Sequence, residues 1–401
     1  MKLKFFLIVI FCFSGFISGE VETQKGPELP GFIGPYLQNP GEDSVTVCFI
    51  TKKGGNPRII IWKAEDSSKV ICRRGSDPIP GTPWTVWKWK VSGLKSGVRY
   101  NYLISHLTNN IPQSTEILSF YIPGNKTIKV ALFNDLHSRY STLELLVNQI
   151  KGEDYDFSVL LGDCWENPES AEQAFLVLYN YINLLNAGEK PMIFVQGNHE
   201  YRGKFAAYMS YLFDLPNLNP QSPPGEQLYY YTLRSGPVWF LIMDCGEDFE
   251  KKFEIMQPYR EKQGKWLKTL LENKEHKKTQ WRVKLSHIPL YNDNIWNSEP
   301  SRKMWEQILQ DAKINISLAG HDHEYKVLKK SETLKVNHEK HGKWEMTPPY
   351  PVMIGGGPGK QEATIMLLEA DENKLHIRMI RGMDGSICGE INIKNGKKRE
   401  N

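Results

Sequence analysis

The sequence predicts an all-β sandwich followed by an α/β domain, and two patterns carry this prediction. Between positions 36 and 121, short alternating runs are separated by Gly, Asn and Pro, which is typical of an antiparallel β-sandwich of about 100 residues. From position 128 onward, apolar strands alternate with amphipathic helices, which indicates an α/β layer architecture. The length of 401 residues agrees with two domains, because a single core seldom grows beyond about 300 residues.

The first part contains four clear strand patterns, at 44–50, 58–62, 87–91 and 100–104. The turn at 94–97 ahead of Tyr100 resembles the tyrosine corner of fibronectin type III domains. The sequence therefore predicts a fibronectin type III-like β-sandwich over residues 33–124.

The second part, residues 125–396, is predicted to alternate strands with helices. Strands are expected at 128–133, 157–161, 192–195, 239–243, 283–285 and 314–318, and helices at 143–150, 171–185, 264–272 and 301–311. The stretch 363–393 holds two or three strand patterns and is expected to form a hairpin on the sheet edge. Segments 203–236 and 246–262 are interpreted as loops that shape the mouth of a cleft.

The N-terminus has the order of a secretory signal peptide. Residues 1–4 are basic, 5–17 are almost wholly apolar, and Ser18-Gly19 supplies small residues. We expect residues 1–19 to be removed on export to a secreted or periplasmic location, with no membrane span afterwards; a retained N-terminal anchor is the alternative. A leader at 20–32 and a tail at 397–401 complete the predicted organisation.

Charge and cysteine content limit the range of partners. Removing residues 1–19 takes away two lysines and no acids, so the formal charge falls from +4 to +2. That value is too small to predict a nucleic-acid duplex or an anionic membrane as a partner. The remaining cysteines are few and widely spaced, so no disulfide framework is predicted, and pairing of Cys48 with Cys72 is left open.

Five of the predicted apolar strands are each followed by Asp, Asn or His. In chain order these residues are Asp135, His137, Asp163, Asn198, His199, His287, His321 and His323. In open α/β sheets, sites form beyond the carboxyl ends of the strands. We therefore expect these side chains to converge on one crevice.

The residue types predict a pair of metal ions. Carboxylate, carboxamide and imidazole ligands suit divalent ions such as Mn, Fe or Zn, and eight groups are too many for one tetrahedral ion. Two ions about 3.5–4 Å apart clamp the attacking and leaving oxygens of a displacement at phosphorus. Glycines at 162, 197 and 320 suit turns where the backbone approaches the ligands closely.

The ordered motifs Asp-X-His, Gly-Asp, Gly-Asn-His-Glu, His and Gly-His-X-His resemble those of the calcineurin-like metallophosphoesterase superfamily, over residues 128–325. The resemblance implies a four-layer αββα sandwich with two metal sites that share Asp163. It implies one metal held by Asp135, His137, Asp163 and His323, and a second held by Asp163, Asn198, His287 and His321. It also implies that His199 faces the substrate as the catalytic residue.

The whole chain, with a β-sandwich in front, resembles the purple acid phosphatases, but it departs from them at two positions. Those enzymes carry glycine in place of His137 and a tyrosine ligand in place of Glu166. Because the tyrosinate favours Fe(III), its absence predicts two divalent ions and no tyrosinate–Fe(III) centre.

We therefore expect a hydrolase that cleaves phosphate esters of small molecules or nucleotides by attack of a metal-bridging hydroxide. His199 would protonate the leaving group, and Glu200 would either orient a neighbouring imidazole or be a surface or helix-start carboxylate. A phosphomonoesterase is favoured. The alternatives are a phosphodiesterase or nucleotidase using the same site, and a non-catalytic binding protein that uses the β-sandwich.

Overall fold

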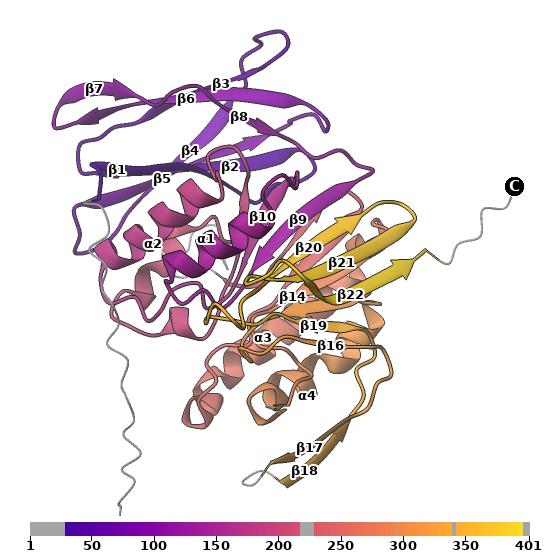
Figure 1. Cartoon of the computed structure of the whole chain (residues 1–401). Helices are drawn as coiled ribbons and strands as arrows, with labels where there is room; N and C mark the ends of the chain where they lie inside the picture. Colours follow the sequence, from indigo (N-terminus) through magenta and orange to yellow (C-terminus); the bar gives the residue numbers. More distant parts are fainter. Residues whose placement is uncertain (1–28, 217–227, 294, 339–341, 396–401) are drawn as a thin grey trace, which may run out of the picture.

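The computed structural model describes residues 29–216, 228–293, 295–338 and 342–395 (Figure 1). The signal peptide expected at 1–19 and the tail expected at 397–401 lie outside the described residues. Within those ranges, no helix has the length and apolar character needed to cross a membrane.

A ten-stranded sheet runs through both parts of the chain. In order across the sheet, its strands are β22 (Ile387–Lys394), β21 (Lys374–Arg381), β20 (Thr364–Ala370), β9 (Ile128–Phe133), β10 (Phe157–Leu161), β11 (Met192–Val195), β1 (Phe32–Gln38), β2 (Ser44–Lys52), β5 (Trp84–Ser92) and β4 (Cys72–Pro78). The junction is a short parallel pairing of β1 with β11, at Gln38 opposite Met192. The two parts therefore share one sheet, and the boundary between 124 and 125 stays a prediction.

The second layer of the N-terminal sandwich is a smaller sheet. It consists of β3 (Arg58–Lys63), β6 (Arg99–Thr108) and β7 (Ile111–Ser114), with β8 (Leu118–Tyr121) also paired to β6. The predicted tyrosine corner is present, because the Lys95 backbone N–H donates to the Tyr100 hydroxyl at 2.9 Å. Cys48 and Cys72 are both free, so the disulfide that was left open does not form in this structure.

A six-stranded sheet packs face to face with the ten-stranded one. In order, its strands are β12 (Tyr231–Ser235), β13 (Val238–Ile242), β14 (Trp281–Leu285), β15 (Ile316–Ala319), β19 (Val352–Ile354) and β16 (Lys326–Leu328). Side chains on a strand alternate between its two faces. On β13, Phe240 accordingly joins the core between the sheets, whereas Trp239 and Leu241 join a second core on the outer face.

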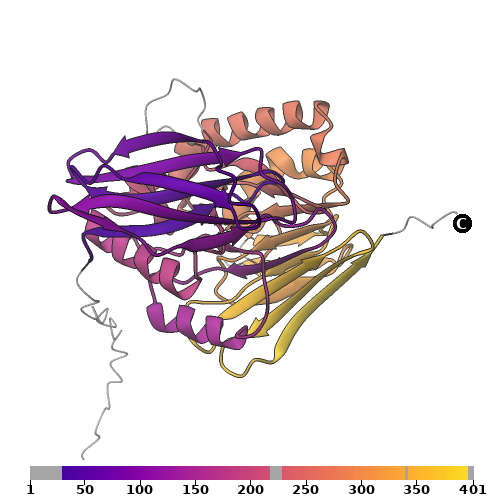
Figure 2. The same ribbon diagram turned by 90° about the horizontal axis from the view of Figure 1, so that it is seen from above.

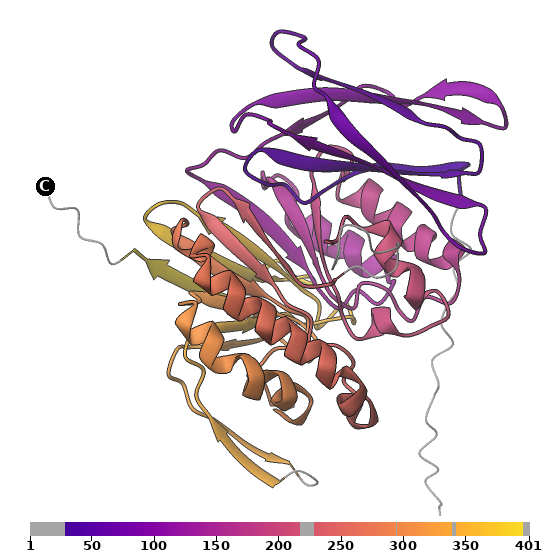
Figure 3. The ribbon, with the colours of Figure 1, turned by 180° about the vertical axis from the view of Figure 1, so that it is seen from behind.

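Helices cover the outer faces of both sheets. Helices α1 (Tyr140–Gln149) and α2 (Ala171–Leu184) lie against the ten-stranded sheet, and α3 (Phe253–Glu272) and α4 (Ile295–Asp311) lie against the other (Figures 2 and 3). The expected αββα sandwich preceded by an all-β region is confirmed. Smaller elements are the hairpin β17 (Leu334–His338) and β18 (Gly342–Met346) and the 3-10 turns η1 (His199–Tyr201), η2 (Ala206–Leu212), η3 (Glu250–Lys252) and η4 (Glu275–Lys277).

Two helices start more than a full turn earlier than the sequence predicts. Helix α3 begins at Phe253 and not at 264, and α4 begins at Ile295 and not at 301, so the loop expected at 246–262 was wrong over most of its length. Both helices contain a proline, Pro258 or Pro300, which normally marks a helix boundary. In α3 the buried Arg260 side chain donates to the carbonyls of Cys245, Glu247 and Phe253, and these bonds hold the first turns against the domain.

Candidate metal centre

The structure brings the eight predicted side chains together at the strand ends. Seven of them form three overlapping groups whose potential ligand atoms lie within 4.8 Å of one another. These groups are Asp135, His137 and His323; His137, Asp163 and His199; and Asp163, His287 and His321. Asn198 joins them, because its Oδ1 lies 3.1 Å from Nδ1 of His321. The expected convergence of the strand ends therefore occurs, while the role of each residue stays a prediction.

Two buried carboxylates form the centre of this cluster, and each faces three imidazoles. Asp163 Oδ2 lies 2.9 Å from Nε2 of His287, 3.8 Å from that of His137 and 3.9 Å from that of His199. Asp135 Oδ1 lies 3.5 Å from Nε2 of His323, 3.7 Å from that of His287 and 3.9 Å from that of His137. Oxygen and nitrogen atoms thus point into one small volume from both sheets.

Two of these atoms lack the aligned hydrogen bonds that burial normally requires. Asp135 Oδ1 is buried without one within the described part of the chain, and His287 Nε2, although 2.9 Å from Asp163 Oδ2, is not well aligned for one. Buried polar atoms are normally hydrogen-bonded, so unmatched atoms that face each other suit a bound cation. The donor set of carboxylate, amide and imidazole fits divalent ions of the Mn, Fe and Zn type.

The charges within the cluster act strongly on its titrating groups. Burial alone would lower the pKa of His287, but the neighbouring Asp163 and Asp135 carboxylates outweigh it and raise the pKa to about 10. Burial and the positive charge of His287 lower the pKa of His321 to about 4. The carboxylates therefore require a positive charge beside them, which an imidazolium or a metal ion supplies.

Hydrogen bonds fix the orientation of the imidazoles. His287 Nδ1 donates to the Leu161 carbonyl at 3.0 Å, and His137 Nδ1 bonds to the Glu166 carboxylate. The Nε2 atoms of both rings are thereby left facing Asp135 and Asp163. Such partners behind a ligating histidine set its tautomer and its orientation. The sequence identifies Glu166 only as the residue at a tyrosine position, and its contact with His137 was not predicted.

The backbone of the site is held in an uncommon conformation. Asp135, His137, Asp163, His321 and His323 have φ angles of 49°, 46°, 48°, 79° and 60°. Residues other than glycine rarely adopt positive φ, and such strain persists mainly at functional sites where surrounding contacts enforce it. Five of the seven predicted metal ligands share this feature.

Close approach explains all three predicted glycines. A Cβ atom at Gly162 would lie 2.4 Å from the His287 side chain, one at Gly197 would lie 2.3 Å from Asp163 Oδ1, and one at Gly320 would lie 2.3 Å from Asp135 Oδ2. Gly162 also has a φ of +81°. The expectation that these glycines let the backbone approach the ligands is confirmed.

Glu200 anchors the loop that carries Asp163. Its fully buried carboxylate accepts the backbone N–H groups of Asp163, Cys164, Trp165 and Gly197 at 2.7–3.0 Å. Burial and the charge of Asp163 raise the pKa of Glu200 to about 7, while these N–H groups act in the opposite direction. The expected imidazole contact and surface position of Glu200 were wrong, because the residue is buried and its described bonds come from the backbone. The helix-start alternative is confirmed, since Glu200 lies in the first turn of η1.

His199 lies at the edge of the cluster between two charged groups. Its backbone N–H donates to Asp163 Oδ1 at 2.8 Å, and its Nδ1 lies 3.0 Å from Glu166 Oε1. Its Nε2 lies 3.0 Å from Arg202 Nη1, and because a guanidinium only donates, we assign Nε2 as the acceptor. Arg202 in turn pairs with Glu247 and Asp248.

Two polar contacts at the site escaped sequence reasoning. Arg202 lies two positions after the Gly-Asn-His-Glu motif, at the end of η1. Its short spacing from His199 in the sequence could therefore have predicted that the two side chains lie close together. Asn297 Nδ2 lies 2.7 Å from His321 Nε2, but Asn297 belongs to α4, whose first turns were not predicted. The sequence carried no local signal for that second contact.

Replacing Glu200 with glutamine tests the anchoring of the loop. The amide presents its own N–H groups to backbone donors, so we expect Glu200→Gln to lower the free energy of unfolding by about 2–4 kcal/mol. The metal content of the purified protein should fall with it, because the loop carrying Asp163 loosens. Urea denaturation and elemental analysis measure the two effects. Glu254→Gln, at an exposed position on α3, is the matched control, and equal behaviour of the two variants would contradict the anchoring role.

Comparison with known proteins identifies the fold around this cluster. Residues 128–325 match the calcineurin-like phosphoesterase family. The chain is 27% identical to "Probable purple acid phosphatase 20" of Arabidopsis thaliana, over 71% of this chain and 66% of the relative. It is 23% identical to "Fe(3+)-Zn(2+) purple acid phosphatase 12" of the same plant, over 80% of this chain and 72% of the relative. The chain thus spans about two thirds of the first relative's length.

A solved structure of Yfce, a phosphoesterase from E. coli, covers 66% of this chain and 98% of its own, with 13% identity and a TM-score of 0.31. That score is too low to support an argument about this chain. The family match coincides with the five strand ends that carry the ligand cluster. Residues 128–325 therefore form a calcineurin-like phosphoesterase domain, and purple acid phosphatases are among the relatives of the chain.

Proposed function

We propose that this chain is an exported, metal-dependent hydrolase of phosphate esters, with phosphomonoesters as its favoured substrates. One observation carries the proposal: two buried carboxylates, one amide and five imidazoles from five strand ends point into a single volume. The names of the Arabidopsis relatives, which are acid phosphatases, support the monoester preference. The signal-like order of residues 1–19 supports export.

The residues divide into two sets around Asp163. We propose that Asp135, His137, Asp163 and His323 hold one ion, and that Asp163, Asn198, His287 and His321 hold the other. The central position of Asp163 Oδ2, within 3.9 Å of three imidazoles, supports its role as the shared ligand. Bound there, two divalent ions supply an activated water and neutralise charge on the phosphoryl oxygens.

The remaining groups position and protonate the substrate. His199 is partly exposed at the edge of the cluster, so its ring can reach a phosphate ester that the ligating residues cannot contact directly. Glu166 lies against both His137 and His199 and thereby couples the orientation of the two rings. We propose that His199 binds the phosphoryl group or donates a proton to the leaving oxygen.

The identity of the ions depends on Glu166. Purple acid phosphatases carry a tyrosine ligand at this place, whereas here a carboxylate lies against His137. We propose two divalent ions without a tyrosinate–Fe(III) centre. The name of the "Fe(3+)-Zn(2+)" relative does not support this part of the proposal, which stands on Glu166 alone.

The visible spectrum of the purified protein tests the nature of the ions. Without a phenolate ligand to Fe(III), we expect a colourless protein that contains two metal equivalents by elemental analysis. A purple solution that bleaches on reduction would overturn the divalent assignment without affecting the proposed hydrolase activity.

Hydrolysis of two nitrophenyl esters tests the function itself. We expect the full-length protein to release nitrophenol from p-nitrophenyl phosphate faster than from bis(p-nitrophenyl) phosphate. A chelator should abolish the activity and added Mn should restore it, because the ions activate the attacking water. Faster cleavage of the diester would favour the phosphodiesterase alternative. No release from either ester with any metal would favour a binding protein that uses the β-sandwich.

Removing the imidazole of His199 separates catalysis from metal binding. We expect His199→Ala to lower turnover of p-nitrophenyl phosphate by about 10²–10⁴-fold, the usual contribution of a general acid or base. Both metals should remain bound, because His199 is not among the proposed ligands. His376→Ala is the control, since that ring pairs with Glu390 on the edge hairpin. Loss of a metal equivalent in His199→Ala would show that the role is misassigned.

A further inference from the structure

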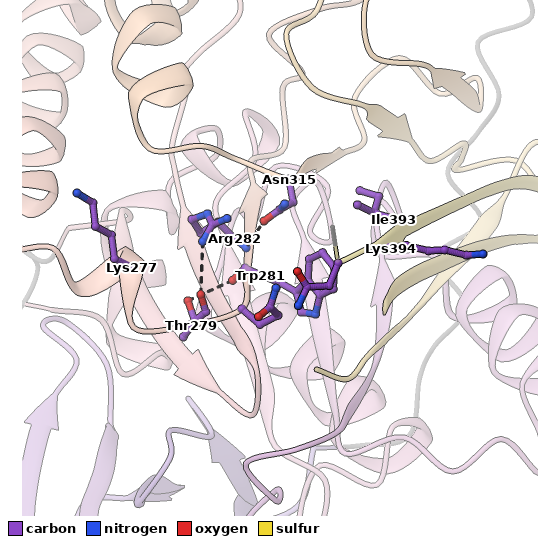
Figure 4. Close-up of a pocket in the computed structure, with 9 residues that line it drawn as sticks. Lys277, Thr279, Trp281, Arg282, Asn315, Ile393 and Lys394 are labelled. Carbon is purple, nitrogen blue, oxygen red and sulfur yellow. Dashed lines mark hydrogen bonds between the residues drawn. The ribbon is translucent and has the colours of Figure 1, made fainter. Parts of the chain in front are cut away.

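Two adjoining cavities lie at the end of the six-stranded sheet that is remote from the metal centre, and Figure 4 shows the smaller one. Their volumes are about 290 Å³ and 530 Å³, and both are lined by Arg282 and Asn315. Strand β14 starts beside them at Trp281 and leads to His287 in the metal centre. Six residues of extended chain span about 20 Å, so the two regions are separate.

All the charged side chains among the described residues that line the groove formed by these two cavities are positive. Five cations line it, namely Lys277, Arg282, Lys313, Lys330 and Lys394, and no carboxylate is among the described lining residues. None of the five forms an ion pair with a carboxylate in the parts of the chain that the structure describes. Burial lowers the pKa of nearby His276, and Lys277, Arg282 and Lys313 lower it further, so these three act as one region of positive potential.

Arg282 lies at the centre of the groove without a counter-charge. Its Nε donates to the Lys313 carbonyl at 2.8 Å, and its Nη1 donates to the Thr279 carbonyl at 3.4 Å. The side chain is half-buried, and burial lowers its pKa. A partly buried guanidinium bonded only to neutral carbonyls keeps much of its desolvation cost, which an anion in the groove would offset.

A neutral donor in the groove also suits an oxyanion. Asn315 lines both cavities, and its Oδ1 accepts the Arg282 backbone N–H at 2.8 Å, which leaves its amide N–H groups for another acceptor. Amide, guanidinium and ammonium groups are donors that bind phosphate and sulfate oxygens.

Helix capping accounts for only part of this charge. Arg282 and Lys313 lie at the C-terminal end of α4, where cations compensate the helix dipole. Lys277 likewise closes the 3-10 turn η4, but Lys330 and Lys394 come from the turn after β16 and from the end of β22. No helix end explains why these last two elements direct lysines to the same groove.

We propose that this groove is a binding site for a multivalent oxyanion, a short chain of linked phosphate groups or a sulfated sugar, separate from the metal centre. The spread of five cations over two cavities favours several linked anionic groups over a single phosphate. In Figure 4, Lys277 and Lys394 lie on opposite sides of Arg282 with their ammonium ends extended outward, so only an anion with several linked charged groups would reach from Arg282 toward both.

Charge reversal at the two flanking lysines tests the proposal. We expect Lys277→Glu/Lys394→Glu in the full-length protein to weaken binding of tripolyphosphate by about tenfold or more in isothermal titration, because two attractive contacts become repulsive. Orthophosphate should bind the wild type much more weakly than tripolyphosphate. A parallel titration with sucrose octasulfate distinguishes phosphate chains from sulfated sugars as the source of the anion.

A matched control separates the groove from net charge. Lys95→Glu/Lys126→Glu changes two exposed lysines of the N-terminal half and alters the net charge equally. We expect its affinity for tripolyphosphate to stay within about twofold of the wild type. The proposed anion site would be overturned if both double variants lost the same affinity. It would also be overturned if neither variant lost affinity for tripolyphosphate or for sucrose octasulfate. Arg282→Gln, with its melting temperature measured, provides an independent third variant.

The proposed hydrolase activity and the proposed anion groove fail separately. Binding at the metal centre is common to all these variants, and p-nitrophenyl phosphate hydrolysis should be the same in each of them. If the wild-type protein hydrolyses neither ester but tripolyphosphate binding is lost on charge reversal, the anion site is supported and the proposed hydrolase function is rejected. The opposite result would retain the enzyme and lose the groove.

Discussion

Two carboxylates, Asp135 and Asp163, are buried within reach of the same imidazole, that of His287. Two negative charges removed from water repel each other and lose their hydration, so a folded state that keeps them must place positive charge between them. The raised pKa of His287 is the response of the protein itself to this demand. The proposed metal ions answer the same demand with more charge and without a proton. The buried acidic pair therefore determines what else must be present in the crevice.

The scaffold places those carboxylates where they are shielded from water. Strand ends of both sheets meet at one edge, and five of the clustered residues there have positive φ. Glu200 then ties the turn after β10 to the turn after β11 through four backbone N–H groups. One buried carboxylate thus restrains another, and the strain at Asp163 persists because these bonds enforce it. The rigidity of the site follows from backbone anchoring and close packing around glycine.

The sequence predicts the strands and the cluster well, because both depend on local patterns. Apolar runs such as 128–133 end in a polar ligand, and the period of the run and the position of the ligand are visible together. What it misses depends on contacts between distant segments. The start of α3 was predicted too late because Pro258 lies within the helix, and proline normally marks a helix boundary. The first turns of α3 are held by Arg260. The β1–β11 pairing that joins the two parts of the chain is non-local, and the roles of Glu200 and Asn297 depend on neighbours that only the fold supplies.

The groove around Arg282 shows that a chain with a small net charge can still carry a local cluster of positive charge. A formal charge of +4 over 401 residues gave no reason to expect an anionic partner. Yet the fold gathers lysines from three separate elements beside Arg282, and it places the acidic cluster at the other end of the same strand. At physiological salt the Debye length is about 8 Å, so charges about 20 Å apart scarcely cancel each other's potential. Each end of β14 therefore presents its own field to solvent, and partners must be inferred from local clusters of charge and not from their sum.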